Sequence, residues 1–256
     1  MAIFGQGGQR RRTGQGGFRR QGVLRAAAAA AQQLTRPDGH GRGALAAFGV
    51  LSAADLVGVN SSPRGLRRAA KPLLMPALAV HVLRRRPDTS APVPKALVAG
   101  LAFAAAGDTA LLFDEHKPAF LLGMAAFLGT QVSYTAGCTG LGALRGIARK
   151  PWPAVGCLAG WAAVNAALAP TLDKQLRLPV AGYSLALVAM TVTALGVGGR
   201  VGAGAAAFLG SDLLIGLKEA GREVPSQEVL IMAGYLLGQY LLTSGWLEHH
   251  DARQTA

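Results

Sequence analysis

Residues 99–113, AGLAFAAAGDTALLF, place one carboxylate, Asp108, inside a run of residues that is otherwise suited to lie in a bilayer. An ionisable side chain near the bilayer centre costs about 2.5 to 3.5 kcal/mol on insertion scales, so it usually faces a bundle interior or a wet cavity and serves a function. A second stretch, residues 203–217 (AGAAAFLGSDLLIGL), repeats the pattern around Asp212. The sequence therefore predicts two functional aspartates within membrane helices.

The residues that follow each aspartate also resemble each other. The pattern M-A-x-[F/Y]-L-x-x-Q occurs without a gap at residues 124–131 and again at residues 232–239, and it ends at Gln131 and Gln239. Membrane folds often contain such internal repeats. We interpret the two stretches as a duplication, in which an Asp-bearing helix is followed by a Gln-bearing helix.

The composition is typical of a polytopic membrane protein. Hydrophobic residues make up 51% of the 256 residues and charged residues only 15%, and the mean hydropathy of +0.31 is high for a soluble domain. A net charge of +13 would indicate nucleic-acid binding in a soluble chain. Here most Lys and Arg lie in the N-terminal tail or between apolar runs, as topology signals do, so no nucleic-acid partner is expected. Cys138 and Cys157 lack metal-ligand or CxxC spacing, so neither a disulfide nor a metal site is indicated.

The chain divides into three regions. Residues 1–41 are rich in Gly, Gln and Arg and predict a disordered basic tail. A solvated cytoplasmic tail is the simpler interpretation, and adhesion to anionic lipid headgroups is the more specific one. Residues 42–248 predict an all-α transmembrane domain with two similar halves, about residues 43–141 and 153–247. Residues 249–256 form a short C-terminal tail.

About eight apolar segments lie in the transmembrane domain, each near the length of a membrane helix although several are short. They cover residues 43–59, 72–83, 93–113, 119–141, 153–169, 179–195, 201–217 and 227–247. The second segment is the weakest, because it extends to a full membrane helix only if residues 66–70 join it.

Basic residues in short loops predict the orientation of these helices. The tail, residues 84–86, residues 145–150 and Arg200 all fall on one side of the membrane, which predicts a multi-pass protein of the cell membrane with both termini in the cytoplasm. The basic loop of residues 61–71 falls on the other side and is an exception to the rule.

The predicted topology brings three carboxylates to one depth. Asp55, Asp108 and Asp212 each lie about four to six residues before the outer end of a helix that runs outward, with a rise of about 1.5 Å per residue. Three acids at one level in a small bundle predict a site. For Asp55, snorkelling to the helix end is an equally good explanation.

Four motifs in this order resemble the YhhN family of lysoplasmalogenases, over about residues 71–245. They are Lys71-Pro72-Leu-Leu-Met-Pro76, Ala99-Gly-Leu-x-Phe103-x3-Gly107-Asp108, Phe208-x2-Ser211-Asp212-Leu213 and Leu230-Ile-Met232-x2-Tyr235-x3-Gln239. The resemblance implies an integral membrane hydrolase acting on ether bonds. Its substrate would be a lysoplasmalogen, a lysophospholipid whose vinyl ether is cleaved to a fatty aldehyde and a glycerophospho-alcohol.

The resemblance also implies residue roles. Asp108 and Asp212 correspond to the catalytic pair of the family, and no cofactor or metal is implied. The chain departs from the family at Gln131, where relatives commonly have a His three residues before a Tyr, here Tyr134. Gln cannot titrate, so activity or substrate can differ, although a Gln can still hydrogen-bond an acid.

Other polar residues of the helices complete the predicted substrate site. Besides Gln131 and Asp55, we expect Lys71, Tyr134, Tyr235 and Gln239 to position water or a phosphate. Each of four residues also has a structural explanation: snorkelling for Lys71, an aromatic belt for Tyr134, and interhelical packing for Tyr235 and Gln239.

The chemistry of a vinyl ether fits two carboxyl groups without a metal. Burial and a neighbouring carboxylate both favour the neutral form of an acid, so two aspartates in one pocket divide into a protonated and an ionised member. The protonated member would protonate the alkene, and the ionised member would stabilise the resulting cation and activate water, as in glycoside hydrolysis. The sequence does not say which aspartate has which role.

Two other functions fit the same residues. Paired acids within a duplicated bundle also describe a proton-coupled transporter. Against this alternative, no predicted helix has the central Gly or Pro break flanked by polar residues that is typical of transporter sites. A membrane assembly factor without enzymatic activity is the third interpretation. The oligomeric state is not indicated.

Overall fold

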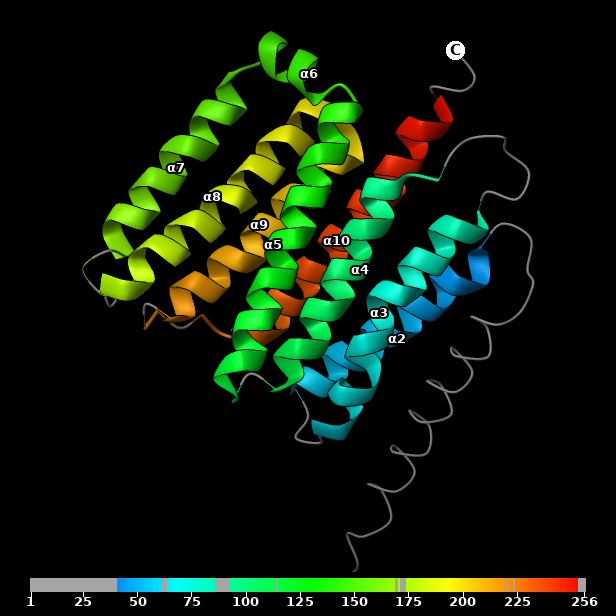
Figure 1. Cartoon of the computed structure of the whole chain (residues 1–256). Coiled ribbons are helices and arrows are strands. Elements are labelled where there is room, and N and C mark those ends of the chain that lie inside the picture. The colour runs from blue at the N-terminus through cyan, green and yellow to red at the C-terminus, as the bar shows by residue number, and fades with distance from the viewer. Residues whose placement is uncertain are drawn as a thin grey trace, which may run out of the picture.

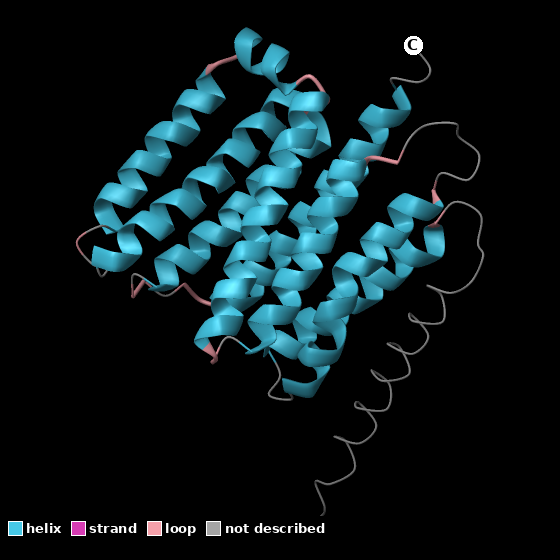
Figure 2. Cartoon of the chain, viewed as in Figure 1, coloured by secondary structure: helices cyan, strands magenta, loops and turns pink. Residues whose placement is uncertain are grey.

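The computed structural model describes residues 41–60, 64–85, 93–113, 115–168, 170, 174–219, 221–222 and 224–252. Within these ranges every regular element is a helix (Figures 1 and 2), which confirms the all-α class. Residues 1–40, and with them nearly all of the predicted basic tail, lie outside the described residues.

Eight long helices coincide with the eight predicted apolar segments. They are α2 (Arg42–Asn60), α3 (Arg64–Arg84), α4 (Lys95–Ala110), α5 (Lys117–Gly140), α7 (Trp152–Leu168), α8 (Lys174–Val197), α9 (Gly199–Glu219) and α10 (Gln227–Ala252). A short 3-10 helix, η1 (Leu111–Phe113), continues α4, and the short helix α6 (Ala143–Arg149) connects α5 to α7. Helix α3 begins well before its predicted start at residue 72, and α10 continues beyond its predicted end at residue 247.

Six of the described helices are long and apolar enough to cross a membrane, so the chain has the features of a multi-pass membrane protein. These candidate spans are Arg42–Val59, Lys95–Phe113, Lys117–Gly140, Arg177–Val197, Gly199–Lys218 and Gln227–Ala252. Helix α7 is apolar but has only 17 residues. Helix α3 begins with four basic residues in its first eight positions, which lowers its mean hydropathy. The crossing of all eight helices therefore stays a prediction.

The order of helix packing positions the two aspartates. Helices α4 and α5 pack against each other, as do α9 and α10, while α3 contacts α4 and α5 contacts α8. In Figure 1, α7 lies at one edge of the bundle and α2 with α3 at the other. Asp108 lies on α4 and Asp212 on α9, which are the third helices of the two predicted halves. That the halves superpose stays a prediction.

Helices α9 and α10 approach each other closely because glycines face one another across their interface. A Cβ atom on Gly204 would lie 2.5 Å from the backbone nitrogen of Leu242 and 2.8 Å from the carbonyl oxygen of Gly238. Small residues allow such backbone contact between membrane helices, where van der Waals packing and not the hydrophobic effect drives association. This contact fixes Asp212 on α9 relative to the residues of α10.

We expect Gly204→Ala to lower the free energy of unfolding by about 1 to 3 kcal/mol, as overpacking typically does. The added methyl group meets backbone atoms, which cannot move aside as a flexible side chain does. Thermal unfolding in detergent measures this loss. Gly210→Ala on the same helix is the matched control, because nothing lies within 4 Å of its added Cβ. Equal melting temperatures for the two variants would contradict the close approach.

Candidate functional site

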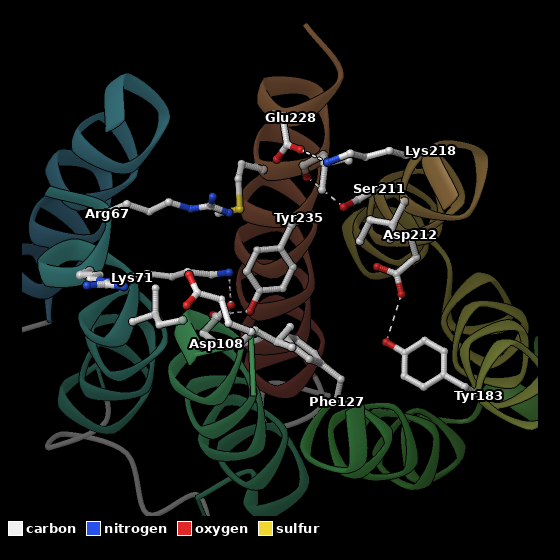
Figure 3. A pocket seen from close by; sticks show the side chains of 17 residues that line it. Arg67, Lys71, Asp108, Phe127, Tyr183, Ser211, Asp212, Lys218, Glu228 and Tyr235 are labelled. Atoms are coloured by element: carbon white, nitrogen blue, oxygen red, sulfur yellow. Dashed lines mark hydrogen bonds and ion pairs between the residues drawn. The ribbon is translucent and has the colours of Figure 1, made fainter. Parts of the chain in front are cut away.

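A pocket of about 470 Å³ lies where α3, α4, α9 and α10 converge, with α8 beside it (Figure 3). Both predicted catalytic residues, Asp108 and Asp212, line this site pocket. The other lining residues are Arg67, Arg68, Lys71, Leu111, Leu112, Glu115, Phe127, Tyr183, Ser211, Ile215, Lys218, Glu228, Ile231, Met232 and Tyr235.

Asp108 is buried and has two polar partners. The Nζ atom of Lys71 lies 3.5 Å from its Oδ1 atom, and the hydroxyl of Tyr235 donates a hydrogen bond of 2.7 Å to its Oδ2 atom. Asp108 is 1% exposed and Lys71 is 7% exposed, so water screens this ion pair little. The ammonium therefore offers Asp108 a buried counter-charge.

Asp212 has a different environment at the same pocket. The hydroxyl of Tyr183, on α8, donates a hydrogen bond of 3.2 Å to the Oδ2 atom of Asp212. The other carboxyl oxygen of Asp212 is turned toward the Tyr235 side of the pocket (Figure 3). In the described part of the chain, no Lys, Arg or His lies within ion-pair distance of Asp212. The two carboxyl groups thus share a pocket but differ in charge compensation.

Tyr235 separates the two aspartates and is held by aromatic contacts. Its ring packs edge to face against Phe127, with centroids 5.9 Å apart, and against Phe208, with centroids 5.4 Å apart. Such geometry is favourable for aromatic pairs. Figure 3 shows Asp108 on one side of Tyr235 and Asp212 on the other. Tyr235 therefore forms a well-packed part of the wall of the site pocket.

Basic residues form one wall of the pocket. Arg67 and Arg68 precede Lys71 on α3, and Lys218 pairs with Glu228 further along the rim. The Nε atom of Arg67 is buried and has no hydrogen-bond partner among the described residues. Residues 64–71, predicted to lie in a basic loop, thus belong to helix α3, and three of them line the site pocket.

The structure brings four of the predicted site residues together and places the other four elsewhere. Asp108, Asp212, Lys71 and Tyr235 line the site pocket, whereas four other residues are buried outside its lining: Asp55, Gln131, Tyr134 and Gln239. Their direct contact with substrate is thus not supported by the geometry. The hydroxyl of Tyr134 donates a 2.8 Å hydrogen bond to Oε1 of Gln239. This bond joins α5 to α10, as expected if Gln239 serves interhelical packing.

Asp55 does not snorkel to the helix end. It is 0% exposed, and both of its carboxyl oxygens are buried without a hydrogen-bond partner in the described part of the chain. The side-chain amide of Gln131 is likewise buried without a full hydrogen bond, and it lies beside the hydroxyl of Tyr183. An unpaired buried polar group costs about 1 to 3 kcal/mol, so these residues are not explained by packing alone.

Sequence reasoning missed Tyr183 and the two arginines of the pocket. Tyr183 is a phenolic hydroxyl within an apolar segment, as Tyr134 and Tyr235 are, so the same signal could have found it. Arg67 and Arg68 belong to the basic stretch that departs from the orientation rule. Such a departure can indicate that basic residues serve a function and not topology. Among the described residues, no group of three or more His, Cys, Asp and Glu is arranged to hold a metal ion.

Comparison with known proteins gives one match. A sequence model of the YhhN family matches residues 66–246, from the start of α3 to near the end of α10, and this range contains every residue that lines the site pocket. The match confirms the resemblance that rests on the four motifs. No curated protein and no solved structure matches the chain.

Proposed function

The chain belongs to the YhhN family, and from this premise we propose that it is a lysoplasmalogenase-like membrane hydrolase. Family membership suggests a membrane hydrolase, and the vinyl ether bond of a lysoplasmalogen is the bond that we propose it cleaves. The observation that carries this proposal is the pair of carboxyl groups on one pocket, of which one has an ammonium partner and the other has only a hydroxyl partner.

This difference supports separate roles for the two aspartates. The Lys71 ammonium stabilises a negative charge on Asp108, so we assign Asp108 as the ionised member. Asp212 has no such partner among the described residues and is therefore the better proton donor. Because Tyr183 donates its hydrogen bond to Oδ2 of Asp212, we assign the acidic proton to the other carboxyl oxygen, Oδ1.

The proposed reaction consumes one water molecule and restores both carboxyl groups. Asp212 donates its proton to the alkene carbon that is not bonded to oxygen, which leaves an oxocarbenium ion that Asp108 stabilises by its charge. Water then adds to the carbon next to the oxygen while one of its protons passes to a carboxylate. The resulting hemiacetal loses its hydroxyl proton, the bond to the glycerol oxygen breaks, and that oxygen takes up a proton. The products are a fatty aldehyde and a glycerophospho-alcohol.

The basic wall supports a phosphate-bearing substrate. Arg67 and Arg68 lie about one helical turn before Lys71 on α3, so a phosphate at the arginines places the rest of a lysolipid toward the aspartates. Guanidinium groups match phosphate geometry through paired hydrogen bonds. The unpaired Nε atom of Arg67 is one donor for such a contact.

We expect Arg67→Gln and Arg68→Gln each to raise KM by about 10- to 100-fold with little change in kcat, because each removes a charge-assisted hydrogen bond to a part of the substrate that does not react. Steady-state kinetics of aldehyde release with a vinyl ether lysophospholipid measures the split. Arg145→Gln, an exposed arginine on α6, is the matched control and should change neither constant. A fall in kcat with unchanged KM would contradict a role in phosphate binding.

A further inference from the structure

A second pocket, of about 390 Å³, lies at the opposite end of the bundle from the site pocket. We call it the basic pocket. It is enclosed by the first residue of α2, the residue after α3, the beginning of α9 and the last turns of α10. Tyr235 and Thr243, on α10, line the site pocket and the basic pocket respectively, and about 12 Å of helix separate them. The basic pocket is thus separate from the proposed catalytic residues.

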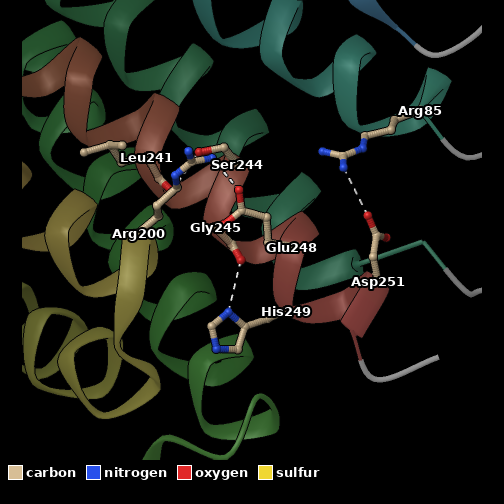
Figure 4. A network of polar contacts seen from close by, with 8 residues as sticks. All are labelled: Arg85, Arg200, Leu241, Ser244, Gly245, Glu248, His249 and Asp251. Atoms are coloured by element: carbon tan, nitrogen blue, oxygen red, sulfur yellow. Dashed lines mark hydrogen bonds and ion pairs between the residues drawn. The ribbon is translucent and has the colours of Figure 1, made fainter. Parts of the chain in front are cut away.

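The lining of the basic pocket carries an excess of positive charge. Arg42, Arg85 and Arg200 line it together with one acid, Glu248. Arg200 forms an ion pair with Glu248, as Figure 4 shows, and Arg85 lies 3.2 Å from Asp251 outside the lining. Arg42 forms no ion pair with any described residue. One guanidinium therefore lines the pocket without a counter-charge from the described part of the chain.

A buried hydroxyl in the same pocket points to a ligand as an independent observation. Thr243 is 1% exposed, and its Oγ1 atom is buried without a hydrogen-bond partner among the described residues. Leaving such a group unpaired costs about 1 to 3 kcal/mol, which a ligand that accepts its hydrogen bond would recover. Guanidinium groups and a hydroxyl donor form a set that recognises phosphate oxygens.

We propose that the basic pocket binds a phosphate-bearing anion, namely the headgroup of an anionic phospholipid in the leaflet at that end of the bundle. Helix α6, which carries Arg145 and Arg149, lies at this end of the bundle (Figure 1), as does Arg200 in the first turn of α9. Basic residues gather on the cytoplasmic side of membrane proteins. Anionic lipids are enriched in that leaflet. The pocket lies between helix ends, where a headgroup enters while its acyl chains stay beside the apolar helices.

Native mass spectrometry of the full-length protein in neutral detergent tests this proposal, with phosphatidylglycerol and phosphatidylcholine as the two probes. We expect one phosphatidylglycerol to be retained in preference to phosphatidylcholine and to raise the melting temperature. Arg42→Gln should weaken the retention about tenfold, because it removes a charge-assisted contact without breaking an ion pair of the described residues. Arg145→Gln, at the same end but outside the pocket, should leave retention unchanged.

A second variant and a third probe complete this test. Thr243→Val keeps the shape of the side chain and removes only the hydroxyl, so it should also weaken retention of phosphatidylglycerol. This variant replaces Arg42→Gln in the test if Arg42→Gln does not fold. Inorganic phosphate is the third probe: a rise in melting temperature with phosphate that is lost in Arg42→Gln supports the anion site and assigns it to a soluble phosphate. Equal retention of both lipids, or full retention by both variants with no response to phosphate, would overturn the proposal.

Discussion

Asp108→Asn and Asp212→Asn should each lower the rate of aldehyde release from a vinyl ether lysophospholipid by about 100- to 10,000-fold. Asn keeps the volume of Asp, and its side-chain oxygen still accepts the hydrogen bond from Tyr235 or Tyr183. It can neither donate an acidic proton nor carry a negative charge. The proposed mechanism forms no covalent intermediate, so little else remains to break the bond.

The measurement is the initial rate of aldehyde formation by purified protein, with a folding check by thermal unfolding. Asp251→Asn is the matched control, because Asp251 is half-exposed and pairs with Arg85 far from the site pocket. The wild-type rate should fall on both sides of an optimum pH, since protonation of one carboxyl group and deprotonation of the other both stop the reaction. Activity near the wild-type level in either aspartate variant would show that the pair has a structural role.

Lys71→Met should reduce both stability and activity, and the loss of stability should be about 3 to 5 kcal/mol. The substitution leaves the buried Asp108 without its ammonium partner. A carboxyl group in that position takes up a proton to avoid the cost of an isolated buried charge, and it then no longer stabilises the oxocarbenium ion. Thermal unfolding and the aldehyde assay measure the two effects separately.

A double variant distinguishes the charge of Lys71 from its volume. Lys71→Met with Asp108→Asn removes both members of the pair, and replacement of a buried ion pair by neutral groups is often nearly neutral for stability. We therefore expect the double variant to recover most of the stability and none of the activity. If the double variant is less stable than Lys71→Met alone, the ion pair does not account for the effect.

The sequence predicts the helices well because bilayer thickness and helix geometry leave few choices for a long apolar run. It fails in part for α3, because the first turns of this helix carry basic residues. Arg67, Arg68 and Lys71 line the site pocket, and their charge lowers the hydropathy of the first turns, so hydropathy alone places the start of this helix too late. The short helix α6 has no apolar signal because it connects two longer helices.

The candidate site shows what residue spacing can and cannot predict. The sequence predicts one depth for Asp55, Asp108 and Asp212, because depth follows from the position of a residue along its helix, yet only Asp108 and Asp212 line the pocket. The direction that a side chain takes around the helix axis depends on packing partners, which spacing in one helix does not reveal. Gln239 lies one turn beyond Tyr235 on the same face of α10, yet it bonds Tyr134 in the core and does not reach the pocket.

The most direct test of the proposed function is aldehyde release by the purified protein in detergent, where no ion gradient exists, from a vinyl ether lysophospholipid and from the matching saturated alkyl ether. We expect aldehyde from the vinyl ether alone, because only its alkene can be protonated to an oxocarbenium ion. A proton-coupled transporter or an assembly factor would release aldehyde from neither lipid. If folded wild-type protein releases no aldehyde from the vinyl ether, the chain is not a lysoplasmalogenase-like hydrolase.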